Sequence, residues 1–284
     1  YHYSLGKLIF DCLPKFLKRP QKAKFVLGQD LDFPYELTEK QSEIVSQISP
    51  MLGNGFSQHY LHGVTGSGKS LVYLKLIKEV IKSGRSAQFL LPEINLTPQF
   101  IKMFEQYVGV KVLSYHSGVT PSQKYNIWRE LKSEKGPFLI MGVRSSIFLP
   151  IDNLGLIIID EEHDSSFKQN DRCPYNGRDV AIKKAHLNNV PVVLGSATPT
   201  VENFEHFIES KNQRFYYQLP DRVGEGYFPS IKLLDIRDKF KEAHSQYPLL
   251  DETVEAIRAK LVQKEQVLVF INKLGYSNFI QCRS

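Results

Sequence analysis

Short apolar runs alternate with amphipathic stretches along most of the chain. Residues Lys69 to Ser83 place apolar side chains at helical spacing and stop before Gly84, which predicts a helix. The runs that predict strands are His59–His62, Gln88–Leu91, Val110–Tyr115, Phe138–Met141, Leu156–Ile159 and Val192–Leu194. This alternation predicts a doubly wound α/β domain with a parallel sheet and flanking helices.

Two interruptions divide the chain. A basic stretch from Lys15 to Asp32 precedes the alternating pattern, and Pro220 to Pro229 breaks it again. We therefore expect a connector in residues 1–27, one α/β domain in residues 28–220 and the start of a second domain in residues 221–284.

Composition narrows the class of protein. The chain has 284 residues, of which 42% are hydrophobic, enough for one α/β domain and part of another. A net charge of +6 permits nucleic-acid binding without establishing it. Cysteines at positions 12, 173 and 282 form no close pair, which favours a reducing cytoplasm. We see no signal peptide and no membrane-spanning run, and because the chain opens with Tyr1 we expect it to be part of a longer protein.

Residues 63–70 fit the phosphate-binding pattern G-x-x-x-x-G-K-[ST], between a predicted strand and a predicted helix. Glycines let such a loop curl so that backbone N–H groups point at phosphate oxygens. Lys69 adds a positive charge, and Ser70 is placed to ligate Mg²⁺. The predicted nucleotide-binding residues are Gly63, Val64, Thr65, Gly66, Ser67, Gly68, Lys69 and Ser70.

A second motif, Asp160-Glu161-Glu162-His163, follows the apolar run Leu156–Ile159. A continuous β-branched run is typical of a parallel strand buried on both faces, and ligands collect at the carboxyl ends of such strands. We expect Asp160 to hold Mg²⁺, directly or through water, and Glu161 to orient and deprotonate the attacking water. The two motifs together predict a nucleotide-driven motor that uses ATP and Mg²⁺.

Two further segments are more typical of a nucleic-acid motor than of a generic ATPase. Ser196 and Thr198, in Gly195–Pro199, are expected to sense the γ-phosphate and relay its loss; the alternative is a simple strand-to-helix turn of small residues. Asn95 and Thr97 offer an amide and a hydroxyl for a nucleic-acid phosphate backbone.

In this order and spacing the motifs resemble those of superfamily 2 helicases, in particular the primosomal replication-restart DNA helicases, over nearly the whole chain. The strings that carry the resemblance are Leu91–Gln99, Tyr115–Gly118 leading to Trp128-Arg129, Asp160–Gln169, Tyr175–Ala181 and Gly195–Pro199. The resemblance implies two RecA-like lobes, the first of them a P-loop NTPase lobe, in an ATP-dependent DNA helicase with DEAH-like motifs.

The resemblance also implies an activity and partners. Such helicases move 3′ to 5′ on single-stranded DNA, recognise stalled or branched replication forks and promote restart with primosome proteins and a single-stranded-DNA-binding protein. The implied location is the bacterial cytoplasm at the nucleoid. Residues 1–27 would then be the remnant of a DNA-binding region, and residues 221–284 the beginning of the second lobe, so we expect this fragment to hydrolyse ATP poorly. Cys282 matches the first cysteine of a zinc-binding insertion and would hold Zn²⁺ only in the intact protein, since such a site needs four ligands.

The resemblance assigns roles to individual residues. Gln41 matches the glutamine that reads adenine, although Thr38-Glu39-Lys40-Gln41 also fits a helix capping box. His163 matches the position that couples hydrolysis to DNA. The stretch Asp164–Arg178 resembles an aromatic-rich loop that senses single-stranded DNA. In that loop Phe167 and Tyr175 would stack on bases, or simply pack, and Lys168 and Arg178 would contact phosphates. Arg144 is also expected to contact DNA.

The chain departs from the family pattern at two places. Val143 stands where threonine is more usual, and Lys273-Leu274 where two arginines are usual. Two alternatives to a helicase stay open. The first is a duplex DNA translocase that does not separate strands, and the second is a fork-binding scaffold whose ATPase site is incidental.

Overall fold

The structure is a computed structural model that describes residues 35–133, 136–170, 173–208, 214–224, 230–234 and 250–270. It divides into two units, Tyr1–Tyr227 and Phe228–Ser284. The predicted connector, residues 1–27, lies outside the described residues. The predicted domain boundaries at residues 27/28 and 220/221 stay predictions.

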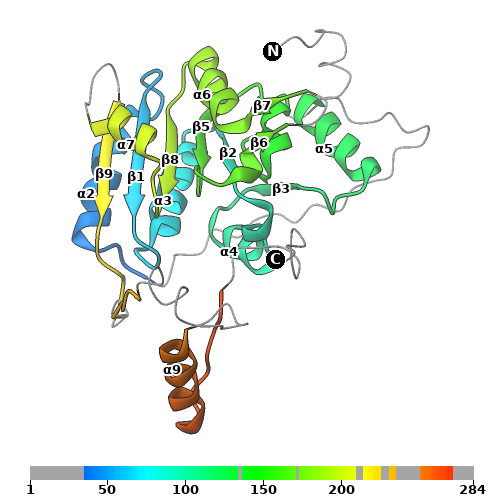
Figure 1. The fold of residues 1–284 in the computed structure, drawn as a ribbon. Coiled ribbons are helices and arrows are strands. Elements are labelled where there is room, and N and C mark those ends of the chain that lie inside the picture. Colours follow the sequence, from blue (N-terminus) through cyan, green and yellow to red (C-terminus); the bar gives the residue numbers. More distant parts are fainter. Residues whose placement is uncertain are drawn as a thin grey trace. The chain divides into compact units, whose positions relative to one another are not determined.

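Seven strands of the first unit form a parallel sheet in the order β3-β4-β2-β5-β8-β1-β9, and the arrowheads of β1 and β9 point the same way in Figure 1. The strands are β1 (Gln58–Gly63), β2 (Ser86–Leu90), β3 (Lys111–Tyr115), β4 (Phe138–Gly142), β5 (Leu154–Ile159), β8 (Val192–Ser196) and β9 (Arg214–Leu219). Each pairing between neighbours in this sheet is parallel. The predicted α/β class is confirmed.

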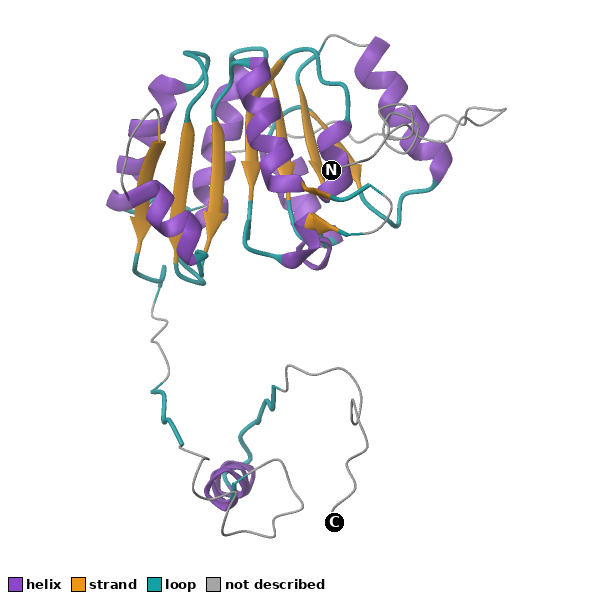
Figure 2. Ribbon diagram, turned by 45° about the horizontal axis from the view of Figure 1, so that its top comes forward, coloured by secondary structure: helices purple, strands orange, loops and turns teal. Residues whose placement is uncertain are grey.

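Helices cover both faces of the sheet (Figure 2). Helices α2 (Glu39–Ile48), α3 (Lys69–Lys82) and α4 (Pro98–Tyr107) pack into one core, and α5 (Pro121–Ser133), α6 (Gly177–Asn188) and α7 (Val201–Ile208) into the other. The connections contain the 3₁₀ turns η1 (Ser49–Met51), η2 (Glu93–Asn95), η3 (Arg144–Phe148) and η4 (Ser165–Phe167), and the antiparallel pair β6 (Lys168–Gln169) and β7 (Tyr175–Asn176).

The central strand β5 shows how the sheet is held between the two cores. All six of its residues are buried. Leu156 and Ile158 belong to the core under α3, and Ile157 and Ile159 to the core under α6, as the two-residue period of a strand requires. The strand therefore delivers the residue after it, Asp160, to the carboxyl edge of the sheet.

The predicted strands agree with the observed ones to within about two residues, and the predicted helix Lys69–Ser83 is α3. Gly84 follows this helix with φ +78°, the left-handed backbone that glycine adopts at a helix end. The edge strand β9 was not predicted. It pairs with β1 along the whole of that strand.

The described part of the second unit contains α9 (Asp251–Val262), whose residues are not buried. Asn272 to Gly275 and Cys282 lie outside the described residues, so the predictions on them stay predictions. Across the ranges the structure describes, no helix has both the length and the apolar character that a membrane span requires.

Candidate nucleotide and nucleic-acid site

The loop of residues 63–70 lies between β1 and α3, and its backbone demands glycine. Gly66 and Gly68 have φ +83° and +77°, in the left-handed region. A Cβ on Gly63 would lie 2.5 Å from Ser67 Oγ, and one on Gly68 only 2.4 Å from Gln41 Nε2. The glycines of the motif are thus explained by conformation and by close packing.

The polar groups of this loop suit an anion. Gly68 begins α3 without a side-chain cap, so N–H groups at the helix N-terminus point out of the helix. Ser67 Oγ is buried and has no hydrogen-bond partner among the described residues. The buried Lys69 Nζ donates to the Gly63 carbonyl oxygen at 2.8 Å. A phosphate group would supply acceptors for all three kinds of donor.

The acidic motif reaches the same edge of the sheet. The Asp160 N–H donates to Leu90 O of β2, and Asp160 Oδ1 accepts from the hydroxyl of Tyr73 at 2.9 Å. Burial, and then the neighbouring Glu161, raises the pKa of Asp160 to about 6. Glu161 Oε1 lies 3.7 Å from Lys69 Nζ. We call Gly63, Ser67, Lys69 and Glu161 the phosphate cluster.

Mg²⁺ fits the donors at this edge. The described residues contain no group of three or more His, Cys, Asp or Glu side chains able to cage a metal ion. Mg²⁺ in nucleotide sites is usually held by one or two protein oxygens together with substrate phosphates and water, and Ser70 and Asp160 are of that kind. Bound there, the ion would neutralise phosphate charge. Cys282, the predicted zinc ligand, lies outside the described residues.

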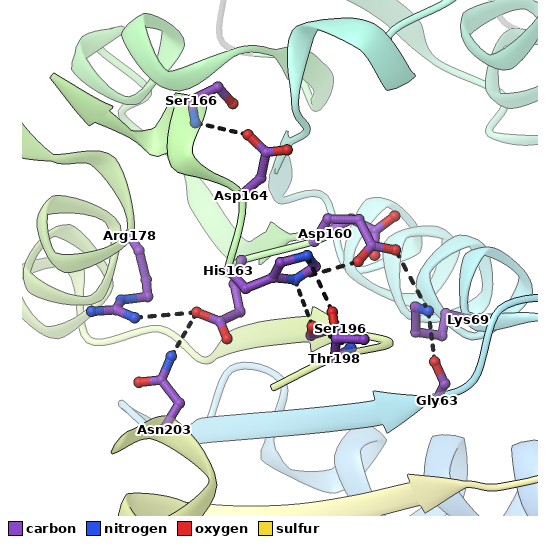
Figure 3. A network of polar contacts seen from close by, with 12 residues as sticks. Gly63, Lys69, Asp160, His163, Asp164, Ser166, Arg178, Ser196, Thr198 and Asn203 are labelled. Atoms are coloured by element: carbon purple, nitrogen blue, oxygen red, sulfur yellow. Dashed lines mark hydrogen bonds and ion pairs between the residues drawn. The ribbon is translucent and has the colours of Figure 1, made fainter. Parts of the chain in front are cut away.

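His163 joins the acidic motif to β8 (Figure 3). Its Nδ1 lies 2.7 Å from Ser196 Oγ and 3.6 Å from Glu161 Oε2, and its Nε2 lies 3.3 Å from Thr198 Oγ1. The structure thus brings together Glu161, His163, Ser196 and Thr198, which come from two separate motifs. Their roles in sensing and coupling stay predictions.

The remaining residue of the motif, Glu162, faces another way and was not predicted to have a role. Its carboxylate accepts hydrogen bonds from Tyr60 Oη at 2.7 Å, Asn203 Nδ2 at 2.7 Å and Arg178 Nη1 at 3.2 Å. Burial and then the charge of Glu162 raise the pKa of Tyr60. We call these four residues the Glu162 cluster. This cluster could not be predicted from the sequence, because nothing local distinguishes the second glutamate from the first.

Gln41 serves the structure in two ways. Its Oε1 accepts from the Thr38 N–H at 3.0 Å while Thr38 Oγ1 accepts from the Gln41 N–H, so the capping box is present. Its Nε2 donates to the Ser67 carbonyl oxygen at 2.8 Å, beneath the loop. A pocket of about 300 Å³ opens beside it, lined by Thr38, Glu39, Lys40, Ser67, Leu219, Asp221, Arg222 and Val223. Adenine recognition by Gln41 stays a prediction.

The segment after the acidic motif bears on an alternative that the sequence left open, between base stacking and packing. The ring of Phe167 is 2% exposed and belongs to the core under α6, so this structure favours packing over base stacking for that residue. Tyr175 is half-buried, edge-on to Phe148 at 5.1 Å and 5.6 Å from the Arg144 guanidinium. Lys168 is exposed.

Arg144 anchors this segment. Its Nη1 donates to the carbonyl oxygens of Ser166 and Lys168, at 2.9 and 2.8 Å. Its neighbour Val143, the departure from the family pattern, uses its backbone N–H on Tyr115 O. One nitrogen of the Arg144 guanidinium, Nη1, therefore holds the backbone of this loop in place.

Asn95 and Thr97 are exposed, as a contact with a phosphate backbone would require. Asn95 ends η2, and Thr97 is the N-cap of α4, where its side chain accepts from the Phe100 N–H at 3.3 Å. Both positions have a complete local structural explanation, so their contact with nucleic acid stays a prediction.

Comparison with known proteins shows which family and which relatives this chain resembles. The family described as "Type III restriction enzyme, res subunit" matches residues 34–201. The chain is 41% identical over 255 residues to "Replication restart protein PriA" of Synechocystis sp., and 40% identical over 255 residues to that of Bacillus subtilis. Each match covers 88% of this chain, and 30% and 31% of the respective relatives, so the chain spans about a third of their length. Among solved structures, RecG bound to a three-way DNA junction is similar over 84% of this chain and 34% of its own, with 18% identity and a TM-score of 0.48.

Proposed function

The chain belongs to the family described as type III restriction enzyme, res subunit, and we propose that it is the nucleotide-binding lobe of an ATP-dependent DNA motor that acts in replication restart. The observation that carries this proposal is the phosphate cluster. Among the residues that the structure describes, a buried lysine, a buried hydroxyl without a partner and a helix N-terminus without a side-chain cap lie beside an acidic pair at one sheet edge. Such donors match the phosphates of a nucleotide.

The residues divide the chemistry among them. Lys69 and the backbone of the loop hold phosphate oxygens, and Ser70 and Asp160 hold Mg²⁺. Glu161 is the base for the attacking water, because it lies next to Lys69 and is less buried than Asp160. His163, with Ser196 and Thr198, carries the state of this site to the nucleic-acid side.

The finer features rest on the relatives and on the family resemblance. We infer 3′ to 5′ movement on single-stranded DNA, recognition of branched forks, primosome proteins and a single-stranded-DNA-binding protein as partners, and a place in the cytoplasm at the nucleoid. Zinc belongs to the whole protein through Cys282. The whole protein's activity is part of this proposal, since the chain spans about a third of its relatives.

The experiment is ATP turnover with and without a forked DNA that carries single-stranded arms, beside the binding of a fluorescent ATP analogue. The proposal expects Mg²⁺-dependent nucleotide binding and, where turnover is measurable, stimulation by the single-stranded arms. Stimulation by blunt duplex alone would favour the translocase. Absence of nucleotide binding would overturn the motor and favour the scaffold.

A further inference from the structure

Glu162 is an acid for which the proposed chemistry has no use. Its side chain has no exposed surface, and its oxygens are filled by donors from three different elements. Tyr60 comes from β1, Arg178 from the first turn of α6 and Asn203 from α7. In Figure 3 Arg178 and Asn203 lie on one side of His163, and Lys69 lies on the other.

The backbone explains how neighbouring residues face opposite ways. Glu161 has φ +48°, in the left-handed region that a non-glycine residue seldom adopts, and the Glu162 N–H donates to Gly195 O of β8 at 3.0 Å. Strained backbone of this kind persists where its surroundings hold it, and such places are often functional. Because Glu161, Glu162 and His163 share one tight turn, a shift of Glu162 moves its two neighbours.

Arg178 is the cation of the Glu162 cluster, and it remains accessible. Its side chain is 22% exposed, with Nη1 3.2 Å from Glu162 Oε2 and Nε 3.0 Å from Asp179 Oδ1. Burial opposes the charge of Arg178, but the bonds to Asp179 and Glu162 raise its pKa above the ordinary value. A guanidinium has five N–H donors, so a phosphate oxygen can reach this side chain and compete for it.

A second basic residue lies against the same helix start. A Cβ on Gly177, the residue before Arg178, would lie 2.9 Å from Arg144 Cγ. Arg144 in turn donates to Lys168 O in the exposed strand β6. Arg144 in η3 therefore lies against the helix start that carries Arg178, and it holds the segment that carries the exposed Lys168; an anionic backbone would be attracted to such basic residues.

We propose that Glu162 is a positioning residue that reports a nucleic-acid phosphate on Arg178 to the nucleotide side of the acidic turn. The inference rests on the proposed function. A phosphate that accepts hydrogen bonds from Arg178 weakens the ion pair between Arg178 and Glu162. Within the described ranges, Arg178 is the one cation that contacts Glu162. Tyr60 and Asn203 continue to hold the carboxylate, so the change is confined to the turn that carries Glu161 and His163.

The test measures coupling between two ligands of this chain. A fluorescein-labelled single-stranded oligonucleotide is titrated with protein, with and without Mg²⁺ and a non-hydrolysable ATP analogue. The ratio of the two dissociation constants is the coupling factor. For a linked pair of sites it is typically about 5 to 150, and the nucleotide affinity must change by the same factor when DNA is added.

Variants at both ends of the pair identify the link. Glu162→Gln keeps the size of the side chain but removes the charge that holds Arg178. We expect the coupling factor of this variant to fall to within about twofold of one. Its nucleotide affinity measured without DNA should change less than about threefold. Arg178→Gln weakens DNA binding itself and should show the same loss of coupling. The double variant should couple no worse than either single one, since both remove one link.

The matched control is Asp179→Asn. Asp179 pairs with the same guanidinium but is exposed and does not contact the acidic turn, so this variant should keep the wild-type coupling factor. Coupling that survives in Glu162→Gln, or that is lost equally in Asp179→Asn, would overturn the inference. If Glu162→Gln fails to fold by circular dichroism, the more exposed Arg178→Gln decides by the same criterion.

Failure of the inference and failure of the proposed function give different results. A wild-type chain that binds neither ligand contradicts the motor itself. A wild-type chain that binds both, with a coupling factor of one, leaves the motor in place and contradicts the role of Glu162 alone.

Discussion

The phosphate cluster and the Glu162 cluster meet at the tight turn that carries Glu161 and Glu162, but they differ in how their polar groups are satisfied. In the phosphate cluster Ser67 Oγ is buried without a partner in the described residues, and Lys69 donates to a backbone carbonyl. In the Glu162 cluster both carboxylate oxygens accept, from two neutral groups and one cation. Buried polar groups are normally paired, so the difference is informative.

The difference indicates that the phosphate cluster is suited to bind a ligand and the Glu162 cluster to hold structural elements together. Donors without strong internal partners bind a ligand at little loss of internal bonding, whereas a buried and fully bonded carboxylate fixes the elements that bond to it. Substitutions in the first cluster should therefore weaken nucleotide binding and leave stability alone. Substitutions in the second should lower stability and leave nucleotide affinity alone, and the two effects can be measured separately.

The largest expected effect is on ligand affinity. Lys69→Ala removes the charge that faces the phosphates, and a hydrogen bond to a charged group is worth about 1.5–3 kcal/mol, so binding of a Mg²⁺–ATP analogue should weaken roughly ten- to hundredfold. Fluorescence titration measures it, and the urea midpoint should stay near that of the wild type. A variant that binds normally would remove Lys69 from the phosphate cluster.

Tyr60→Phe tests the Glu162 cluster. It leaves a buried Glu162 oxygen without its donor, which should lower the free energy of unfolding by about 1.5–3 kcal/mol with nucleotide affinity unchanged. Urea denaturation gives the first value. Tyr216→Phe is the control, because the Tyr216 hydroxyl bonds to His62 at a partly exposed position and meets no buried charge. Equal losses in the two variants would contradict the special weight of the Glu162 cluster.

The pH dependence of binding sharpens the comparison further. Mg²⁺ needs the Asp160 carboxylate, and burial raises the pKa of this group to about 6, so the proton leaves only as the pH rises through about 6. Affinity for the Mg²⁺–nucleotide complex should therefore fall about tenfold per pH unit below 6 and level off above 7. Titrations from pH 5 to 8 measure this, and Asp160→Asn should abolish the step. A midpoint near 4 would contradict the raised pKa.

The smallest effect is expected at the pocket beside the loop. Lys40 and Asp221 form an ion pair at 2.9 Å, but both side chains are mostly exposed. Pairs of this kind contribute about 0–1 kcal/mol, so Lys40→Ala should change the free energy of unfolding by less than about 1 kcal/mol. Nucleotide affinity should stay within about threefold of the wild type. A large loss of affinity would bring Lys40 into direct contact with the ligand.

Sequence periodicity predicted the sheet well because its strands are buried on both faces and read as apolar runs. The order of the strands was not predictable, since β5 lies between β2 and β8 through pairings between distant segments. The edge strand β9 was missed because only two of its six residues are buried. Its run Phe215-Tyr216-Tyr217 carried the aromatic signal of a strand and was passed over.

The site residues were predictable where a sequence motif determines their chemistry. They were not predictable where their role depends on the direction of the side chain. The loop with Lys69 and the acidic pair lie together as expected. Glu162 was missed because its direction depends on the unusual backbone of Glu161, which no local pattern indicates. For Phe167 the sequence left base stacking and packing both open, because an aromatic residue in a loop suits either place, and in this structure its ring lies in the core.

The position of β1 in the sheet has a consequence for how the domain forms during synthesis. The strand that carries the loop of residues 63–70 pairs only with β8 and β9, which leave the ribosome long after it. Pairings between such distant segments form slowly, since a long loop must close first. A nascent chain that ends before β8 has made every residue of the phosphate cluster, but β1 then has neither of the strands with which it pairs.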